Sequence, residues 1–143
     1  MDAREAIELI EHGEDQRVEF KSKASEIGES LCAFANTNAG TILVGVSDSG
    51  EVVGCSPKEE HRIANIGQTC RPAVHPDIER VDVNGKLVLI VRVPKGSEPF
   101  YSFKNVVYRR VGTNDMPISP DQVVELAHRT GAIRFDEQVC EEA

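Results

Sequence analysis

The chain has 143 residues, of which 40% are hydrophobic and 28% are charged. This balance is typical of an ordinary globule with one core, and it excludes a disordered or fibrous chain. The formal net charge of −8 argues against a protein that coats DNA through charge alone, because nonspecific affinity comes from neutralising phosphates with Lys and Arg.

The acidic residues gather at the two ends of the chain. Residues 1–14 carry five of them and residues 136–142 carry four, while the stretch between is close to neutral. A local basic face is therefore possible there, and any nucleic-acid site must be local.

The sequence shows no sign of export or membrane insertion. No apolar run approaches the roughly 20 residues that cross a bilayer, and the amino-terminal residues have no signal-peptide pattern. Cys32, Cys55, Cys70 and Cys140 are scattered, without a C-x-x-C motif or paired His at zinc spacing. We expect a cytoplasmic protein with reduced thiols.

The first elements predicted are a helix and a strand. Asp2 and Gly13 fit the two ends of a helix over residues 3–11, because Asp caps helix N-termini and Gly ends helices. Polar and apolar side chains then alternate over residues 17–23, the period of a half-buried strand. Glu19 shares the polar face of this strand with Arg17, Lys21 and Lys23.

A second helix and a buried strand follow. Apolar residues at helical spacing predict a helix with one apolar stripe over residues 25–37. The Asn-rich turn at residues 36–40 fits a plain helix C-cap and also fits phosphate binding. Residues 41–46 are continuously aliphatic or β-branched, which predicts a central strand buried on both faces. The turn at residues 48–50 predicts a hairpin to residues 52–53.

The middle of the chain predicts a third helix over residues 57–70, with Pro57 in its first turn. Asn84-Gly85 then separates the strands expected at residues 78–83 and 87–93. This pair is a strong hairpin signal, because both residues tolerate the positive φ of a type I′ turn.

A second hairpin is expected from residues 100–103 and 106–111, with its turn at Lys104-Asn105. Residues 112–117 are expected to form a loop.

Ser119 and Pro120 begin a final helix in which Val123, Val124 and Ala127 face inward, and Gly131 ends it. The fold class predicted is α+β: a mixed, mainly antiparallel sheet with β-hairpins, packed by three or four helices. We expect one domain over residues 1–134 and an acidic, frayed tail over residues 135–143.

Four local patterns occur in one order, at residues 14–21 (EDQRVEFK), 32–40 (CAFANTNAG), 45–50 (GVSDSG) and 108–113 (YRRVGT). Together they resemble the Schlafen AlbA-type domain, which occurs in bacterial and archaeal regulators and in animal Schlafen proteins. The resemblance covers about residues 12–130. It implies the fold expected above and a function in nucleic-acid binding, and some Schlafen members cut tRNA and rRNA with a carboxylate cluster.

By this resemblance, Glu14 and Glu19 match two glutamates in an E-x-x-x-x-E-F-K stretch, and Asp48 matches an acidic residue after the central strand. These three carboxylates are the predicted ligands of Mg²⁺ or Mn²⁺, which would polarise a phosphate or activate water. Lys21 is predicted to join them as a catalytic residue that stabilises charge on the scissile phosphate.

Simpler interpretations of these residues stay open. Glu19 can form a surface ion pair with Arg17 or Lys21. Asp48 precedes Ser-Gly and is a good turn residue in its own right. Glu14 can be one more solvated charge after the first helix.

Other polar and aromatic residues are candidates for nucleic-acid contact. Tyr101 or Tyr108 can stack a base, and strand alternation places Arg109 on the opposite side from Arg110. No G-x-x-x-x-G-K-[ST] loop is present, so we expect no ATP binding. The predicted nucleic-acid-binding residues are Lys21, Lys23, Arg71, Lys104, Tyr108 and Arg110.

The leading hypothesis is a metal-dependent endoribonuclease that acts on structured RNA such as tRNA. The alternative is a non-catalytic DNA- or RNA-binding module of a transcriptional regulator, and a third option is a protein-interaction module. Animal Schlafen cores resemble two such lobes in one chain, so a homodimer is expected here. Its basic rim would include Lys21, Lys23 and Arg110, and no membrane partner is expected.

Overall fold

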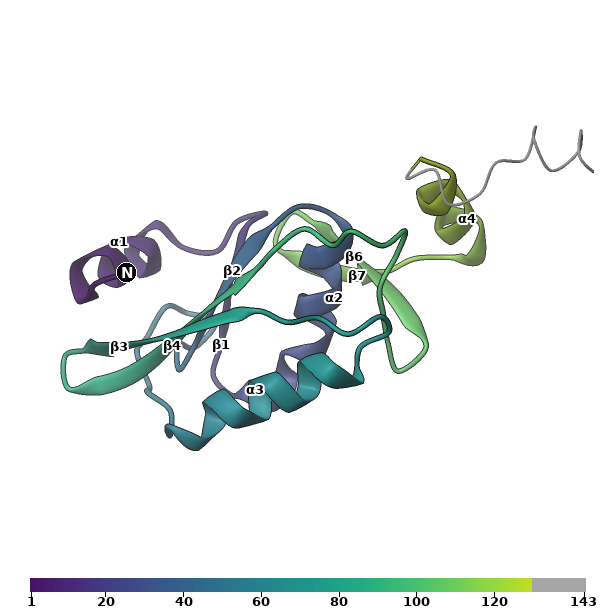
Figure 1. The fold of residues 1–143 in the computed structure, drawn as a ribbon. Coiled ribbons are helices and arrows are strands. Elements are labelled where there is room, and N and C mark those ends of the chain that lie inside the picture. The colour runs from purple at the N-terminus through teal and green to yellow at the C-terminus, as the bar shows by residue number, and fades with distance from the viewer. Residues whose placement is uncertain (130–143) are drawn as a thin grey trace, which may run out of the picture.

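The computed structural model describes residues 1–129, and Figure 1 shows how their elements are arranged. The helices are α1 (Ala3–His12), the 3₁₀ turn η1 (Ala24–Glu26), α2 (Gly28–Asn36), α3 (Lys58–Thr69) and α4 (Pro120–Arg129). The strands are β1 (Val18–Lys21), β2 (Gly40–Val44), β3 (Asp77–Val83), β4 (Lys86–Val93), β5 (Ser102–Phe103), β6 (Val106–Val111) and β7 (Asn114–Pro117).

The main sheet has four strands in the order β1-β2-β4-β3. β1 and β2 run parallel, and the other neighbours run antiparallel, so the sheet is mixed. β2 lies inside the sheet, and its residues Ile42, Leu43 and Val44 are fully buried, as their aliphatic run predicts. The α+β fold class is confirmed.

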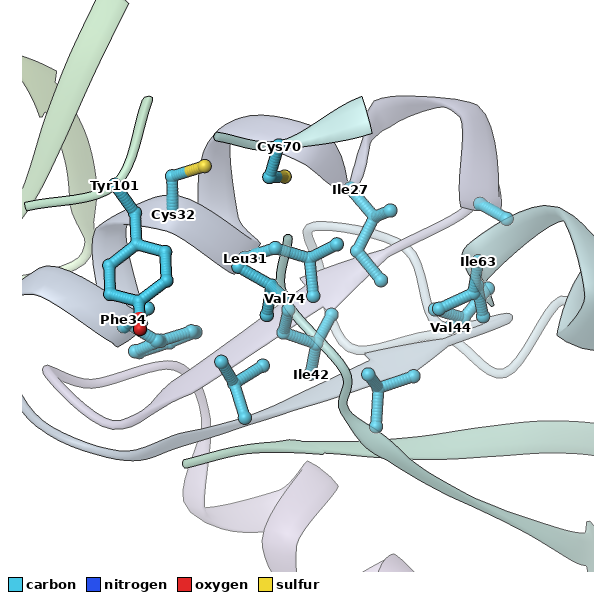
Figure 2. Packing of buried hydrophobic residues seen from close by; sticks show 14 of the residues in the cluster. Ile27, Leu31, Cys32, Phe34, Ile42, Val44, Ile63, Cys70, Val74 and Tyr101 are labelled. Atoms are coloured by element: carbon cyan, nitrogen blue, oxygen red, sulfur yellow. The ribbon is translucent and has the colours of Figure 1, made fainter. Parts of the chain in front are cut away.

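The two faces of this sheet carry separate apolar clusters, because side chains alternate along each strand. Ile42 and Val44 of β2 face α2 and α3, where they pack with Ile27, Leu31 and Phe34, as Figure 2 shows. On the opposite face, the cluster that contains Leu43, Val88 and Ile90 packs against α1. The main sheet therefore lies between α1 and the pair α2 and α3.

A second sheet, in the order β5-β6-β7, lies against α2. Asn36, at the end of α2, holds this second sheet through hydrogen bonds. The Asn36 side-chain amide donates 2.8 Å hydrogen bonds to the carbonyls of Tyr101 and Tyr108, and its Oδ1 accepts a 2.6 Å bond from the Tyr101 backbone N–H. The position of this sheet is thus set by a partly buried side chain at the end of α2.

Both predicted hairpin turns are confirmed. Asn84 and Gly85 have φ values of 54° and 83°, and Lys104 and Asn105 have φ values of 51° and 66°. These φ values lie in the left-handed region of backbone conformation, which suits Gly and Asn. Lys104 also adopts this conformation, as part of its turn.

The loop predicted for residues 112–117 is wrong, because β7 pairs there with β6. Gly112, with φ 61°, lets the chain reverse, and the strand exists because β6 offers a partner edge. The helix predicted for residues 25–37 is split into η1 and α2 around Ile27. The hairpin expected at residues 46–53 is reduced to one bridge between Val46 and Val52.

The prediction that Val124 faces inward is also wrong, since 43% of its surface is exposed. In Figure 1, α4 stands apart from the main sheet. The predictions for the Ala127 side chain, Gly131, Cys140 and the tail 135–143 fall outside the described part of the structure. None of the helices in residues 1–129 combines the length and the apolar character that a membrane span requires.

Candidate functional site

Two groups of charged residues include residues that the sequence predicted for the site. The first, which we call the buried charge cluster, consists of Glu14, Glu19, Lys21, Arg110 and Asp115. It lies where β1 and the loop before it meet β6 and β7, so it joins the two sheets. Glu19 is 7% exposed and Arg110 is 1% exposed. The half-buried strand with a solvated polar face predicted here is therefore wrong: β1 is buried on both sides.

Arg110 forms the centre of this cluster. Its guanidinium contacts the carboxylates of Glu19 and Asp115, each at 3.0 Å. It also donates hydrogen bonds to the backbone carbonyls of Asp15, at 2.8 Å, and Val18, at 3.0 Å. Five donors on a planar guanidinium make Arg suited to such a buried position.

The remaining contacts complete the enclosure of Arg110. The ring of Phe34 lies 4.8 Å from the guanidinium carbon, a cation–π contact. The Arg110 backbone N–H donates to the hydroxyl of Thr37, and the hydroxyl of Ser30 donates to Asp115. The guanidinium is thus held in the interior, and an exposed basic rim that includes Arg110 is wrong.

Glu19 has an unusual protonation equilibrium. Burial, the largest cause, and a side-chain hydrogen bond with Glu14 together raise the pKa of Glu19 to about 7, against the opposing effect of Arg110 and Lys21. Lys21 Nζ lies 3.3 Å from Glu19 Oε1. The direction follows first from burial, which disfavours the charged carboxylate, and second from the neighbouring carboxyl group of Glu14.

The predicted metal ligands do not form a metal site. Glu14 and Glu19 are adjacent, but Asp48 is exposed in the turn after β2. Within residues 1–129, no group of three or more His, Cys, Asp or Glu side chains is arranged to hold a metal ion. Glu14 Oε2 also accepts a 2.9 Å hydrogen bond from the Phe20 N–H. The donor set therefore does not fit Mg²⁺ or Mn²⁺.

The second gathering of charge is a basic cleft of about 750 Å³ between η1, the end of α3 and the β5–β6 turn. Its three cationic side chains are Arg62, Arg71 and Lys104, all exposed. The cleft is lined by Ser25, Arg62, Ile66, Thr69, Arg71, Ser102, Phe103, Lys104 and Asn105. Two predicted nucleic-acid-binding residues, Arg71 and Lys104, are thus brought together.

Backbone pairing explains why these two residues meet. Arg71 and Ser102 exchange backbone hydrogen bonds of 2.9 Å in both directions, which joins the end of α3 to β5. The tight turn that follows then places Lys104 beside Phe103, with Nζ 5.3 Å from the ring centroid. The cleft is therefore built from segments that are far apart in the sequence.

The other predicted contact residues lie elsewhere. Lys21 belongs to the buried charge cluster, and Lys23 is exposed before η1, outside the cleft. The Tyr108 hydroxyl donates a 3.3 Å hydrogen bond to Glu29, and burial raises the pKa of this hydroxyl. Tyr101 is 6% exposed within the core, which contradicts its prediction as a stacking surface. Arg109 is exposed, and its placement opposite Arg110 is confirmed.

Most of the residues that line the cleft, and Asp115 of the buried charge cluster, were not predicted as site residues. Phe103 had the one sequence signal that could have indicated a site residue, because it precedes a basic turn residue within a predicted hairpin. Arg62 lies one helical turn before Ile66 and was one of several charges on α3. Asp115 was missed because its strand was predicted to be a loop.

Several solved structures are similar to this chain, among them one from Corynebacterium diphtheriae and one from Nitrosomonas europaea. A crystal structure of a protein from Corynebacterium diphtheriae aligns with a TM-score of 0.63 and 23% identity, and covers 78% of this chain and 23% of that one. The chain thus spans less than a quarter of that protein, and the likeness shows the fold alone.

The second structure is the N-terminal domain of a protein from Nitrosomonas europaea that is described as related to the ATP-dependent DNA helicase RecG. It aligns with a TM-score of 0.54 and 28% identity, and covers 80% of this chain and 93% of that domain. The family model described as Schlafen, AlbA_2 matches residues 14–119, well over half of the chain, so this protein belongs to the Schlafen AlbA_2 family.

Proposed function

We propose that this protein binds nucleic acid at the basic cleft. One observation carries the proposal: three exposed cations and an aromatic ring surround a single hollow in a chain whose net charge is −8. Positive charge concentrated in this way provides local attraction for phosphates that the chain as a whole does not provide. The description of the Nitrosomonas protein as helicase-related is consistent with this function.

Arg71 contributes most directly to this proposal. Within the described residues its side chain takes part in no ion pair, whereas Arg62 is paired with Glu59 at 3.5 Å. Lys104 is similarly without a carboxylate partner in this part of the chain, and rests on Phe103. Both cations are therefore available to phosphates at no cost in broken ion pairs.

Fluorescence anisotropy with a labelled oligoribonucleotide tests the proposal. The double variant Arg71→Ala/Lys104→Ala should weaken binding at least tenfold at low salt, because each phosphate contact contributes to affinity. Lys95→Ala removes an exposed cation that does not line the cleft and is the matched control. Equal affinity for the double variant and the control would reject the cleft as the binding site.

A second candidate function is cleavage of structured RNA such as tRNA by a metal-dependent endoribonuclease. The adjacent Glu14 and Glu19 favour it, as does the Glu19 pKa of about 7, because perturbed carboxyl groups cluster at functional sites. Against it, Glu19 is enclosed by Lys21 and Arg110, and among the described residues no third carboxylate joins Glu14 and Glu19 in a metal-binding group. Cleavage would require these carboxylates to rearrange.

Incubation of tRNA with the protein and Mn²⁺ separates the two candidates. Cleavage that is lost in Glu19→Gln and in excess chelator would support the endoribonuclease. Intact tRNA that nevertheless binds would leave the protein a binding module. The Arg71→Ala variant keeps the carboxylates but removes a cation of the cleft, so it tests whether any cleavage depends on binding at the cleft.

We also propose that two copies of the chain associate through the outer face of β6 and β7. Val111 and Met116 are 51% and 46% exposed on this face, and Val124 of α4 is 43% exposed. Apolar residues exposed together at such a level mark an interface more often than isolated ones do. Light scattering should give about twice the 15.7 kDa chain mass, and Met116→Asp should give the monomer mass.

A further inference from the structure

We infer that the basic cleft accepts an unpaired nucleotide of a single-stranded nucleic acid, with its base stacked on Phe103 and its phosphates bound by Arg71 and Lys104. This inference rests on the proposed nucleic-acid binding and specifies the ligand of that site. Three features of the cleft support it: a fixed ring, a displaceable cation over that ring, and small polar groups nearby.

The Phe103 ring is held in one position. It lies against Gly28 at the start of α2, where a Cβ atom would come within 2.4 Å of the ring Cζ. Glycine at this position therefore makes the slot that seats the ring. The ring also packs against the core cluster of α2 and α3, yet it is only partly buried and lines the cleft. A ring fixed on one side and open on the other is a stacking platform.

The cation on this platform is the second feature. Lys104 Nζ lies 5.3 Å from the centroid of the Phe103 ring, and Lys104 is exposed. An exposed cation–π contact contributes little stability. A base can therefore replace the ammonium on the ring, and the adjoining phosphate then pairs with that ammonium. A ligand needs both a flat ring and an anionic group for this exchange.

The third feature is the polar lining. Ser25, Thr69 and Asn105 offer hydroxyl and amide groups around the same hollow. Such groups can bind base edges or a ribose hydroxyl. In a duplex the base faces are stacked on their neighbours, so a ring set inside a hollow reaches only a base that has left the helix. The cleft is therefore expected to discriminate against double-stranded ligands.

Fluorescence anisotropy with four probes tests this inference on the full chain. The probes are a labelled oligoribonucleotide of eight nucleotides, the same strand annealed to its complement, an abasic strand of equal length, and inorganic polyphosphate. The natural single strand should bind roughly 5- to 150-fold more tightly than the abasic strand, the range expected for one stacked base. The duplex should bind no better than the abasic strand, and polyphosphate should displace the natural strand poorly.

Two variants locate the stacking surface. Phe103→Leu keeps an apolar side chain but removes the flat ring, and should abolish the preference for the natural strand without changing abasic binding. Gly28→Ala displaces the ring without altering any charge, and should reduce the preference in the same way. For both variants the salt dependence of binding should equal that of the wild type, whereas Arg71→Ala should reduce its slope by about 0.7.

The outcomes separate the two levels of the proposal. If no probe binds, the proposed function itself fails. If the natural strand binds but the duplex binds equally, or if Phe103→Leu keeps the full preference, nucleic-acid binding stands and the single-strand inference is overturned. Polyphosphate binding equal to that of the natural strand would likewise overturn it, since charge alone would then account for the affinity. Circular dichroism of each variant confirms that the fold is retained.

Discussion

The buried charge cluster and the basic cleft use the same kinds of side chain for opposite purposes. In the cluster, Arg110 is enclosed by two carboxylates and two backbone carbonyls, and no part of its guanidinium is exposed. In the cleft, Arg71 is exposed, and its side chain forms no ion pair within residues 1–129. Both residues are arginines in segments with strand pairing, so residue type does not distinguish them.

The difference between the two regions is where the partners of each charge come from. A buried guanidinium is tolerated only when other protein groups replace its lost water, and the cluster provides such groups for both terminal nitrogens of Arg110. An exposed guanidinium keeps its water and can exchange it for a phosphate. Arg110, whose charge stabilises the fold, thus lies in a different place from Arg71, whose charge is available to a ligand.

The most severe test of this comparison is Arg110→Ala. Removal of the guanidinium leaves Glu19 and Asp115 buried without their cation, and breaking such a buried pair costs about 3–5 kcal/mol in the free energy of unfolding. Urea denaturation measures this loss. A cost below 1 kcal/mol would show that the cluster is not structural.

Glu19 tests the cluster through pH. Its pKa is raised from 4.5 to about 7 in the folded protein, so its contribution to stability is complete below pH 4.5 and is lost as pH rises through 7. The loss should amount to about 3 kcal/mol relative to Glu19→Gln, which cannot ionise. Urea denaturation of both proteins between pH 4.5 and 8 measures the difference, and parallel curves would contradict this protonation equilibrium.

Gly67→Ala tests whether the cleft depends on backbone packing. A Cβ at position 67 would lie 2.3 Å from the backbone carbonyl oxygen of Val74, so the segment that carries Arg71 must shift. Overpacking of this kind costs about 1–3 kcal/mol, and oligonucleotide binding should weaken in parallel. Gln68→Ala, at an exposed position of the same helix, is the control and should change neither quantity.

Arg71→Ala gives the smallest expected change in stability. An exposed side chain without an ion pair should alter the free energy of unfolding by less than about 0.5 kcal/mol, in contrast to the same substitution at Arg110. Oligonucleotide affinity should nevertheless fall. If Arg71→Ala destabilised the protein as strongly as Arg110→Ala does, the contrast between the two regions would be lost.

Features set by neighbouring residues could be predicted from the sequence. The Asn84-Gly85 and Lys104-Asn105 turns follow from local backbone preferences, and the burial of β2 follows from its aliphatic run. β7 was missed because Asn, Asp and Pro favour loops, and only its pairing with β6 makes the segment a strand.

The two sites were only partly predictable, because they depend on contacts between distant segments. The pattern around Glu19 indicated a polar strand face, but nothing near Glu19 shows that Arg110 and Asp115 cover it. The placement of Arg71 beside Lys104 follows from pairing between Arg71 and Ser102, which a residue pattern does not contain. The resemblance predicted that Glu14, Glu19 and Asp48 lie together, whereas in the structure Glu14 and Glu19 are adjacent and Asp48 lies in an exposed turn.

The bonds made by Asn36 have a consequence for how the chain folds. This single side chain joins the end of α2 to Tyr101 and Tyr108, which follow it by 65 and 72 residues. Such long-range contacts close large loops, and they form only after much chain entropy has been lost. Docking of the β5–β6 hairpin, and with it completion of the cleft, is therefore expected to be a late folding event. Hydrogen exchange should accordingly show this hairpin opening at a lower free energy than β2 and β4.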